Sequence, residues 1–186
     1  VSRFKVIKQN EPYTTKEIIE ETGLPCFVKP NRGGSSFGIT KVFKEEELEA
    51  AINKAFEEDY EALAEEYLEG TELTCGLIKT EGKEYIFPST EIVSKNEFFD
   101  YEAKYTKGMA DEITPSRISQ ELEQEVQRLS SKIYDIFDCR GIVRIDYIYR
   151  DGKLYFMEVN TIPGMSAASI VPQQIRAAGY TLQEIL

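Results

Sequence analysis

The chain has 186 residues and a net charge of −11, with 41% hydrophobic and 30% charged residues. This composition excludes an intrinsically disordered chain, and the negative charge argues against duplex nucleic acid as a partner. The absence of histidine excludes Ser-His-Asp and Cys-His catalysis and histidine-ligated zinc.

The cysteines and the apolar runs predict where in the cell the protein lies. Cys26, Cys75 and Cys139 are far apart and odd in number, and they show neither a disulfide framework nor a metal-binding spacing. We expect buried thiols in a cytoplasmic protein. Because no apolar run approaches the length of a membrane span, and no charged-then-apolar leader is seen, we expect no membrane partner.

The first third of the chain predicts two helices around a short hairpin. Gly23 and Pro25 are expected to stop the first helix, which follows Thr14. Apolar side chains at helical spacing from Leu48 to Phe56 predict the second helix. The predicted elements are a helix over 15–21, strands over 26–30 and 39–42 with a Gly- and Ser-rich loop between them, and a helix over 45–59.

The rest of the chain predicts strands around one long helix. Ser119 can cap that helix, whose apolar stripe ends at Phe137. The segment 98–114 is too long and polar for a plain connection, and long ordered loops are often functional. The other predicted elements are strands over 63–67, 73–80 and 85–93, a hairpin of 142–149 with 154–159, and a helix from about 171 to 178. This order predicts an α+β protein with largely antiparallel sheets.

The predicted hairpin carries charged and amide side chains at alternate positions of two apolar strands. Arg144 and Asp146 share a face of the first strand, and Glu158 and Asn160 share a face of the second. Mg²⁺ prefers carboxylate and amide oxygens, and a fixed arginine beside them suits phosphate chemistry. A structural ion pair is the alternative for Arg144 with Glu158, but it leaves Asp146 and Asn160 unexplained.

The turn of this hairpin decides whether the two polar faces coincide. A two-residue Asp-Gly turn pairs Tyr149 with Leu154. Because a one-residue shift in register moves a side chain to the other face, that turn is expected to separate Asp146 from Glu158.

A three-residue turn, with a G1 bulge at Gly152, pairs Tyr149 with Lys153 instead. Arg144 then lies opposite Glu158, and the four polar side chains share one face. We predict this bulged turn, because it lets the charged and polar groups serve one another.

Lys29 stands directly before the Gly- and Ser-rich loop, residues 31–38. The loop is not a P-loop, because no Gly-Lys-Ser/Thr ends it and no helix follows. Its backbone N–H groups could cover phosphates above Lys29. The alternative is an ordinary glycine-rich hairpin loop.

Two further segments have a functional and a structural interpretation. Around Tyr67 and Leu68, a purine could pack while Glu65 and Glu72 accept hydrogen bonds; a solvated acidic edge is the alternative. The segment 100–105 is either a lid that brings Lys104 to phosphates or a mixed-charge loop.

Taken together, these motifs resemble the D-alanine–D-alanine ligase family of the ATP-grasp superfamily. The resemblance covers essentially the whole chain, and the last two motifs are its most specific part. In the order of the family, the motifs are Val28-Lys29-Pro30 with Arg32, Gly34-Ser35-Ser36-x-Gly38, Tyr67-Leu68-x-Gly70-x-Glu72, Asp100-Tyr101-Glu102-Ala103-Lys104-Tyr105, Arg144-Ile145-Asp146, and Glu158-Val159-Asn160-Thr161-x-Pro163-Gly164-Met165-Ser166.

The resemblance implies an ATP-grasp fold whose two α+β subdomains, at 1–69 and 70–186, hold ATP between them. It also implies a role for each matched residue. Lys29 and Lys104 would bind the phosphates; Glu65, Tyr67, Leu68 and Glu72 the adenosine; Asp146, Glu158 and Asn160 two Mg²⁺ ions, for which Mn²⁺ can substitute; Arg144 and the Gly164 N–H the oxyanion; Ser169 the carboxylate of the second substrate; and Ser35 with Tyr105 would join the two loops over the site.

The implied activity is the ATP-dependent ligation of two D-alanine molecules through an acyl phosphate, for peptidoglycan precursor synthesis, by a cytoplasmic homodimer. The N-terminal domain of the family is missing from this sequence, and Ala168 stands where the family often has histidine. Two alternatives stay open: a non-catalytic ATP-binding module, and a ligase whose second substrate is D-serine or D-lactate. By resemblance, Tyr105 favours D-alanine.

Overall fold

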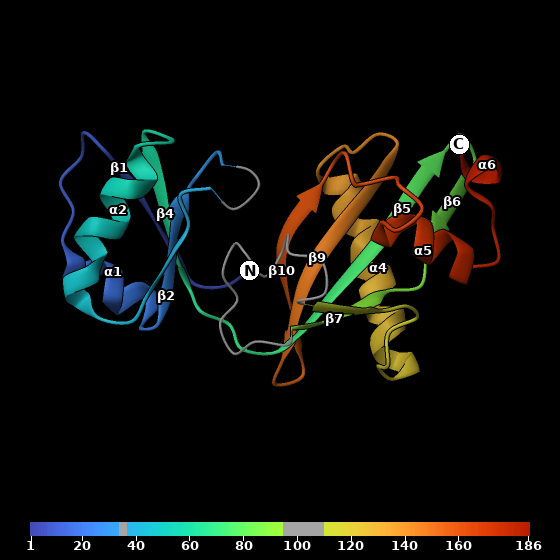
Figure 1. The fold of residues 1–186 in the computed structure, drawn as a ribbon, viewed down its shortest axis with the longest axis horizontal. Coiled ribbons are helices and arrows are strands. Elements are labelled where there is room, and N and C mark those ends of the chain that lie inside the picture. Colours follow the sequence, from blue (N-terminus) through green and yellow to red (C-terminus); the bar gives the residue numbers. More distant parts are fainter. Residues whose placement is uncertain (34–36, 95–109) are drawn as a thin grey trace. The chain divides into compact units, whose positions relative to one another are not determined.

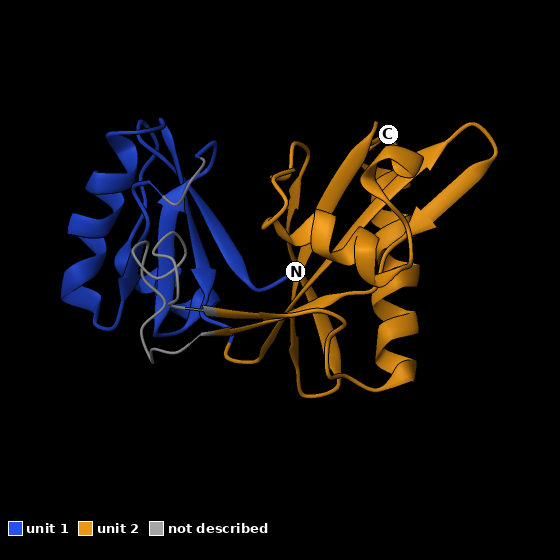
Figure 2. Ribbon diagram, turned by 45° about the vertical axis from the view of Figure 1, so that its right-hand side comes forward, with its two compact units in different colours: residues 1–68, 99–105 blue, residues 69–98, 106–186 orange. Residues whose placement is uncertain are grey.

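The computed structural model describes residues 1–33, 37–94 and 110–186 (Figure 1). The chain divides into two compact units, with a boundary between Leu68 and Glu69, and Figure 2 shows them in separate colours. Each unit has its own sheet and its own hydrophobic core. Within the described ranges, no helix is long and apolar enough to cross a membrane.

Unit 1 is a four-stranded antiparallel sheet in the order β1-β4-β2-β3, with α1 and α2 on one face. Ile18 of α1 and Ile52 of α2 pack on Val28 and Ala64 of the sheet, and all four side chains are fully buried. The edge strand β1 was not predicted. The elements are β1 (Phe4–Lys8), α1 (Thr15–Thr22), β2 (Cys26–Pro30), β3 (Thr40–Val42), the 3₁₀ turn η1 (Glu45–Glu47), α2 (Leu48–Phe56) and β4 (Glu61–Glu66).

Helix α1 begins and ends where its sequence predicts. The Thr14 hydroxyl accepts a hydrogen bond from the Glu17 N–H at 3.2 Å and so caps the first turn. Gly23 follows the helix with a φ of 71°, a conformation that a side chain disfavours, and its N–H donates to the Ile19 carbonyl at 2.8 Å.

Unit 2 is built on a six-stranded antiparallel sheet, in the order β10-β9-β5-β7-β8 with β6 also paired to β5, as far as its described residues show. Because side chains alternate along β5, Leu73 and Leu77 face α4 while Gly76 and Ile78 face α5. The elements are β5 (Thr71–Thr80), β6 (Lys83–Ile86), β7 (Thr90–Ser94), β8 (Ala110–Ile113), α4 (Gln120–Ile136), β9 (Ile142–Arg150), β10 (Lys153–Asn160), α5 (Ile170–Ala177) and α6 (Leu182–Ile185).

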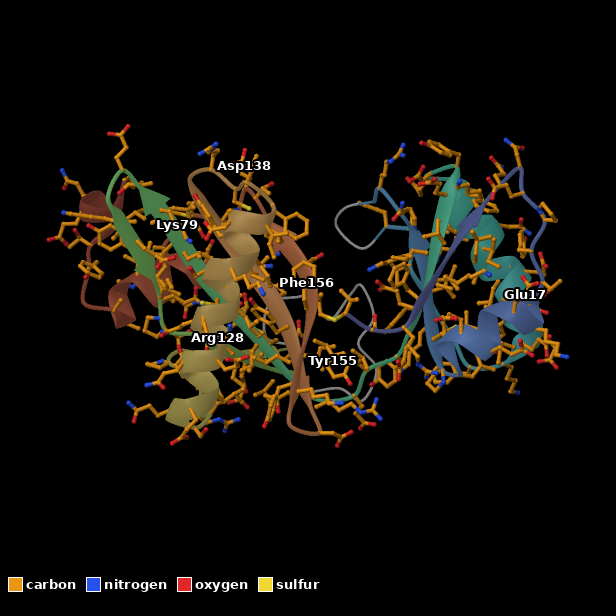
Figure 3. The ribbon with its side chains drawn as sticks, turned by 180° about the vertical axis from the view of Figure 1, so that it is seen from behind. Glu17, Lys79, Arg128, Asp138, Tyr155 and Phe156 are labelled. Carbon is orange, nitrogen blue, oxygen red and sulfur yellow. The ribbon has the colours of Figure 1, made fainter. Side chains whose placement is uncertain are left out.

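The face of this sheet under α4 is the larger core of unit 2. Figure 3 views the molecule from this side, with Phe156 of β10 near one end of α4, where its ring centroid lies 5.9 Å from that of Phe137. The single strand predicted over 85–93 is two strands, β6 and β7, interrupted around Pro88. The cysteines are buried as expected, and burial raises the pKa of the Cys75 thiol to about 12.

Gln174 of α5 is fully buried at the point where β5 changes its partner from β7 to β6. Its Oε1 accepts from the Gly76 N–H at 2.9 Å. Its Nε2 donates to the Thr74 carbonyl at 2.8 Å and to the Thr90 hydroxyl at 3.0 Å. The Gln174 side chain therefore satisfies backbone groups of β5 that neither neighbouring strand reaches.

The substitution Gln174→Leu is expected to lower the free energy of unfolding by about 3 kcal/mol, because it leaves a buried N–H and a buried carbonyl without partners. Urea denaturation measures this loss. Gln127→Leu is the matched control, since the half-buried Gln127 donates, within the described part of the chain, only to Glu123, at 3.0 Å. If the two variants lose equal stability, the bridging role of Gln174 is wrong.

Candidate functional site

Five polar side chains gather on the face of the unit 2 sheet opposite to α4, around the carboxylate of Asp146. Arg144 donates to both of its oxygens, Nε to Oδ1 and Nη2 to Oδ2, each at 2.9 Å. The Thr74 hydroxyl donates to Oδ1 at 2.6 Å and Asn160 Nδ2 donates to Oδ2 at 2.9 Å. Asn160 Nδ2 also lies 3.4 Å from Glu158 Oε1. The structure therefore brings together the four polar residues predicted on the hairpin, and adds Thr74.

The hairpin turn has the two-residue form, so the predicted three-residue turn is wrong. Tyr149 pairs with Leu154 rather than with Lys153. Asp151 and Gly152 have φ values of 50° and 76°, the positive values that a type I′ turn requires and that an Asp-Gly pair adopts readily.

A bulge further along β10 returns the polar side chains to one face. Phe156 pairs with Tyr147, but the next pair in register is Glu158 with Asp146, so Met157 is the extra residue. The bulge that unites the site thus lies at Met157, not at the turn.

The same bulge lets the apolar side chains of β10 stay in the core under α4. Phe156 and Val159 both pack in the core under α4, although they are three positions apart. Without the extra residue, Glu158 would point into that core in place of Val159, and an unpaired carboxylate there would be costly. After the bulge, Asn160 pairs with Arg144. The prediction that Arg144 lies opposite Glu158 is therefore wrong.

Arg144 is held as a charged group inside the sheet face. The side chains of Arg144 and Asp146 are 22% and 15% exposed. Burial lowers the pKa of the Arg144 guanidinium, but the hydrogen bonds that it donates to Asp146 and the charges of Asp146, Glu158 and Glu72 outweigh this effect and raise the pKa above its ordinary value. Within the described residues, Nη1 of Arg144 donates to no protein group, and its N–H groups can therefore serve a ligand.

The oxygen donors suit a divalent cation that shares its coordination with a substrate. Among the residues that the structure describes, no group of three or more Asp, Glu, Cys or His side chains could hold a metal, so a cation bound here would need the Asn160 amide as a ligand beside the carboxylates. Its Nδ2 faces both carboxylates, and a half-turn of the amide presents Oδ1 there instead. Mg²⁺ typically takes one or two carboxylates together with waters and phosphate oxygens, and these residues fit that pattern.

The loop after β10 places Gly164 against Ser169. A Cβ added to Gly164 would lie 2.8 Å from the Ser169 hydroxyl, so a side chain at this position would collide with it. That hydroxyl is 2.8 Å from the Ser166 hydroxyl, and Arg176 anchors the loop by donating to the Ala167 carbonyl at 2.8 Å. The loop therefore holds two hydroxyls beside a glycine, a small polar surface on which a carboxylate could bind.

In unit 1, Lys29 and Glu65 are in direct contact. Lys29 Nζ lies 2.7 Å from Glu65 Oε2, and the side chains are 29% and 16% exposed. Both residues point away from the helices, because their neighbours Val28 and Ala64 fill the core. Two residues that were expected to bind different parts of a nucleotide are thus partners in this structure.

Lys41 covers one face of the Tyr67 ring. Its Nζ lies 3.5 Å from the ring centroid, and Phe27 meets the same ring edge-on with a centroid distance of 5.8 Å. Leu68 is only 6% exposed. A purine packed on Tyr67 and Leu68 therefore finds little free side-chain surface, and Lys41 is a neighbour that sequence reasoning missed.

The remaining predicted residues fall into two groups. Glu72 lies on β5, two positions from Thr74, and its charge contributes to the raised pKa of Arg144. Ser35, Lys104 and Tyr105 lie outside the described residues.

Comparison with known proteins gives consistent matches along the whole chain. Residues 1–186 match the family described as "D-ala D-ala ligase C-terminus". A D-alanine–D-alanine ligase of Bacteroides fragilis is 52% identical over 187 residues, which cover all of this chain and 57% of that protein. A D-alanine–D-alanine ligase of Flavobacterium johnsoniae is 47% identical over 179 residues, 96% of this chain and 55% of that protein.

Solved structures agree with these matches. The VanG D-Ala:D-Ser ligase from Enterococcus faecalis has a TM-score of 0.88 and 37% identity, and the match covers 100% of this chain and 54% of that one. The D-alanine–D-alanine ligase from Bacillus anthracis complexed with ATP has a TM-score of 0.80 and 33% identity, over 99% of this chain and 58% of that one. The chain thus spans little more than half the length of the relatives it matches.

Proposed function

Because the chain belongs to the D-ala D-ala ligase C-terminus family, we propose that it supplies the ATP-grasp part of a ligase that joins two D-alanine molecules at the expense of ATP. Its fold is the α+β ATP-grasp fold that the motifs predicted, as its likeness to solved relatives confirms. The cluster around Asp146 carries the proposal, because it combines hard oxygen donors with a fixed guanidinium on one sheet face.

Asp146, Glu158 and Asn160 would hold the metal, two Mg²⁺ ions for which Mn²⁺ can substitute. When bound, Mg²⁺ would neutralise the charge of the ATP phosphates. The Asn160 amide can serve this role only after it turns from its present hydrogen bond with Asp146, which exposes an oxygen of each residue.

The reaction proposed has two steps and needs no protein nucleophile. The γ-phosphoryl group of ATP passes to the carboxylate of one D-alanine, which forms an acyl phosphate and ADP. The amine of a second D-alanine then attacks the acyl carbon, loses a proton, and phosphate leaves. Positioning and charge stabilisation suffice for this chemistry, which agrees with a chain that has no histidine.

Arg144 is suited to the second step. Its Nε and Nη2 are engaged by Asp146, which fixes the plane of the guanidinium. The position of Nη1 is thereby fixed, and Nη1 can still donate to a developing oxyanion. The Gly164 N–H is proposed as the second donor. Ser169 would bind the carboxylate of the second substrate.

The contact of Lys29 with Glu65 suggests how unit 1 takes part. An ATP phosphate would replace Glu65 as the partner of Lys29, and Glu65 would then accept hydrogen bonds from the adenosine together with Glu72. Lys104, Ser35 and Tyr105 are proposed to act over the phosphates. A cytoplasmic homodimer with no nucleic-acid or membrane partner completes the proposal.

A ligase with another second substrate is a specific alternative, because one structural relative is a D-Ala:D-Ser ligase. A calorimetric titration with Mg-ATP, followed by a phosphate-release assay with D-alanine alone or with D-serine or D-lactate added, separates the possibilities. We expect this chain to bind ATP but to be inactive by itself, and we expect phosphate release with D-alanine alone from protein that is competent for D-alanine ligation.

The matched variants for this test are Lys29→Met and Lys16→Met, since Lys16 is an exposed lysine on α1 of the same unit. We expect only Lys29→Met to weaken ATP binding, by about tenfold or more, because a charge-assisted phosphate contact is lost. ATP binding without phosphate release would favour the non-catalytic module. Absence of ATP binding would contradict the proposed function.

A further inference from the structure

The carboxylate of Asp146 is fully used as a hydrogen-bond acceptor. An ionised carboxylate has about four lone-pair sites, two on each oxygen. Here Oδ1 accepts from the Thr74 hydroxyl at 2.6 Å and from Arg144 Nε at 2.9 Å. Oδ2 accepts from Arg144 Nη2 and from Asn160 Nδ2, both at 2.9 Å. A cation can reach Asp146 only where one of these four donors gives way.

The two oxygens differ in how readily they lose a donor. Thr74 is 2% exposed and lies directly opposite Asp146 in the pairing of β5 with β9. Both donors of Oδ1 therefore come from the interior of the sheet. Asn160 is the last residue of β10, and its amide can turn about its own side-chain bond. Oδ2 is thus the oxygen that can be released.

We propose that Thr74 is a positioning residue for the metal site: with Arg144 it saturates Oδ1, so that Asp146 binds the cation through Oδ2 alone, and this single-oxygen contact favours Mg²⁺ over Ca²⁺. The inference rests on the proposed function, because it assumes that Asp146 is a metal ligand. No motif of the chain assigned a role to Thr74.

The selectivity follows from the different demands of the two ions. Mg²⁺ needs near-octahedral geometry at about 2.0–2.1 Å, whereas Ca²⁺ takes roughly 6–8 oxygens at about 2.3–2.6 Å and readily accepts both oxygens of one carboxylate. A carboxylate with one oxygen held by Thr74 and Arg144 offers Ca²⁺ no second oxygen. Without the Thr74 hydroxyl, a lone pair of Oδ1 becomes available and the carboxylate is less firmly oriented.

The test is Mn²⁺ binding followed by electron paramagnetic resonance, with Mg²⁺ and Ca²⁺ as competitors, on the wild-type chain and on Thr74→Val. Mn²⁺ needs no catalytic turnover to be detected. We expect Thr74→Val to raise the Kd for Mn²⁺ on the order of tenfold, as is typical when a group that orients a metal ligand is removed. We also expect the Kd ratio of Ca²⁺ to Mg²⁺ to fall several-fold. Thr74→Ser keeps the hydroxyl and should restore both values.

Thr90→Val is the matched control. Thr90 is as buried as Thr74, and its hydroxyl bonds to Thr114 at 2.6 Å and to Gln174 at 3.0 Å but to no carboxylate of the residues that the structure describes. It should lose comparable stability and keep wild-type metal binding. If Thr74→Val is unfolded at the temperature of the titration, Thr74→Ala takes its place as the test variant, because it removes the same hydroxyl.

The outcomes separate the inference from the function on which it rests. Wild-type Mn²⁺ binding that is weakened by Glu158→Gln establishes the metal site. If Thr74→Val then matches the wild type in affinity, or loses affinity with an unchanged ratio of Ca²⁺ to Mg²⁺, the inference is overturned and the function stands. Wild-type Mn²⁺ binding that Glu158→Gln leaves unchanged would overturn both.

Discussion

Replacing Glu158 with glutamine is expected to abolish Mg²⁺-dependent formation of ADP while it leaves the stability of the chain nearly unchanged. The side chain is exposed, and among the described residues it accepts a hydrogen bond from Asn160 alone, at 3.4 Å, so the fold depends little on its charge. Metal binding at the proposed site would depend on the Glu158 carboxylate, because the amide of glutamine is a much weaker ligand for a hard cation than a carboxylate is.

ADP release as a function of Mg²⁺ concentration, together with the melting temperature, measures both parts of this expectation. Glu81→Gln, at an exposed position in the turn between β5 and β6, is the control that removes an equal charge from the same unit. An Mg²⁺ dependence equal to that of the wild type would count against Glu158 as a ligand.

The second large effect is expected for Arg144→Ala, in protein that is competent for D-alanine ligation. Loss of one oxyanion donor typically lowers kcat on the order of 10²–10³-fold. The variant should also be less stable by about 3 kcal/mol, because Asp146 loses two of its hydrogen bonds and stays mostly buried without its counter-charge. The kcat and the stability of Arg144→Lys should lie between those of the wild type and Arg144→Ala, since lysine keeps the charge but not the paired geometry.

Rates of dipeptide formation under conditions where every variant is folded separate the catalytic effect from the effect on stability. Arg117→Ala is the control, because Arg117 forms a similar paired contact with Glu91, at 2.8 and 2.7 Å, and is 62% exposed. Near wild-type turnover in Arg144→Ala would refute its role in the reaction.

The hairpin shows where reasoning from the sequence succeeded and where it failed. The alternation of Arg144 with Asp146 correctly placed both on one face, because the side-chain period of a strand is two. The predicted position of the bulge was wrong, because Asp151 and Gly152 adopt the two-residue turn that an Asp-Gly pair prefers.

A signal for the true bulge was present in β10. The side chains that pack under α4 include Leu154, Phe156 and Val159, at spacings of two and then three. A change of spacing in the apolar side chains of a strand marks an extra residue between them, here Met157. The apolar spacing of β10 therefore locates the bulge, whereas its polar residues alone do not.

Other features had a weak signal or none. The edge strand β1 carries the apolar residues Phe4 and Val6 on its exposed face, where they are 47% and 40% exposed. Its sequence therefore lacks the alternation of apolar and polar residues that marks a half-buried strand. The sequence around Lys41 does not indicate its contact with Tyr67. That contact arises because the order of strands in the sheet brings these two distant segments together.

The sequence by itself determined which oxygen donors and which cation this protein offers, and that they alternate along two strands, because residue type and strand period are local properties. Only the tertiary structure decided what surrounds them. Thr74 reaches Asp146 across 72 residues of chain, and Gln174 reaches β5 across 98 or more. Such contacts follow from how strands and helices pack to bury their apolar faces, and no spacing within a motif contains that information.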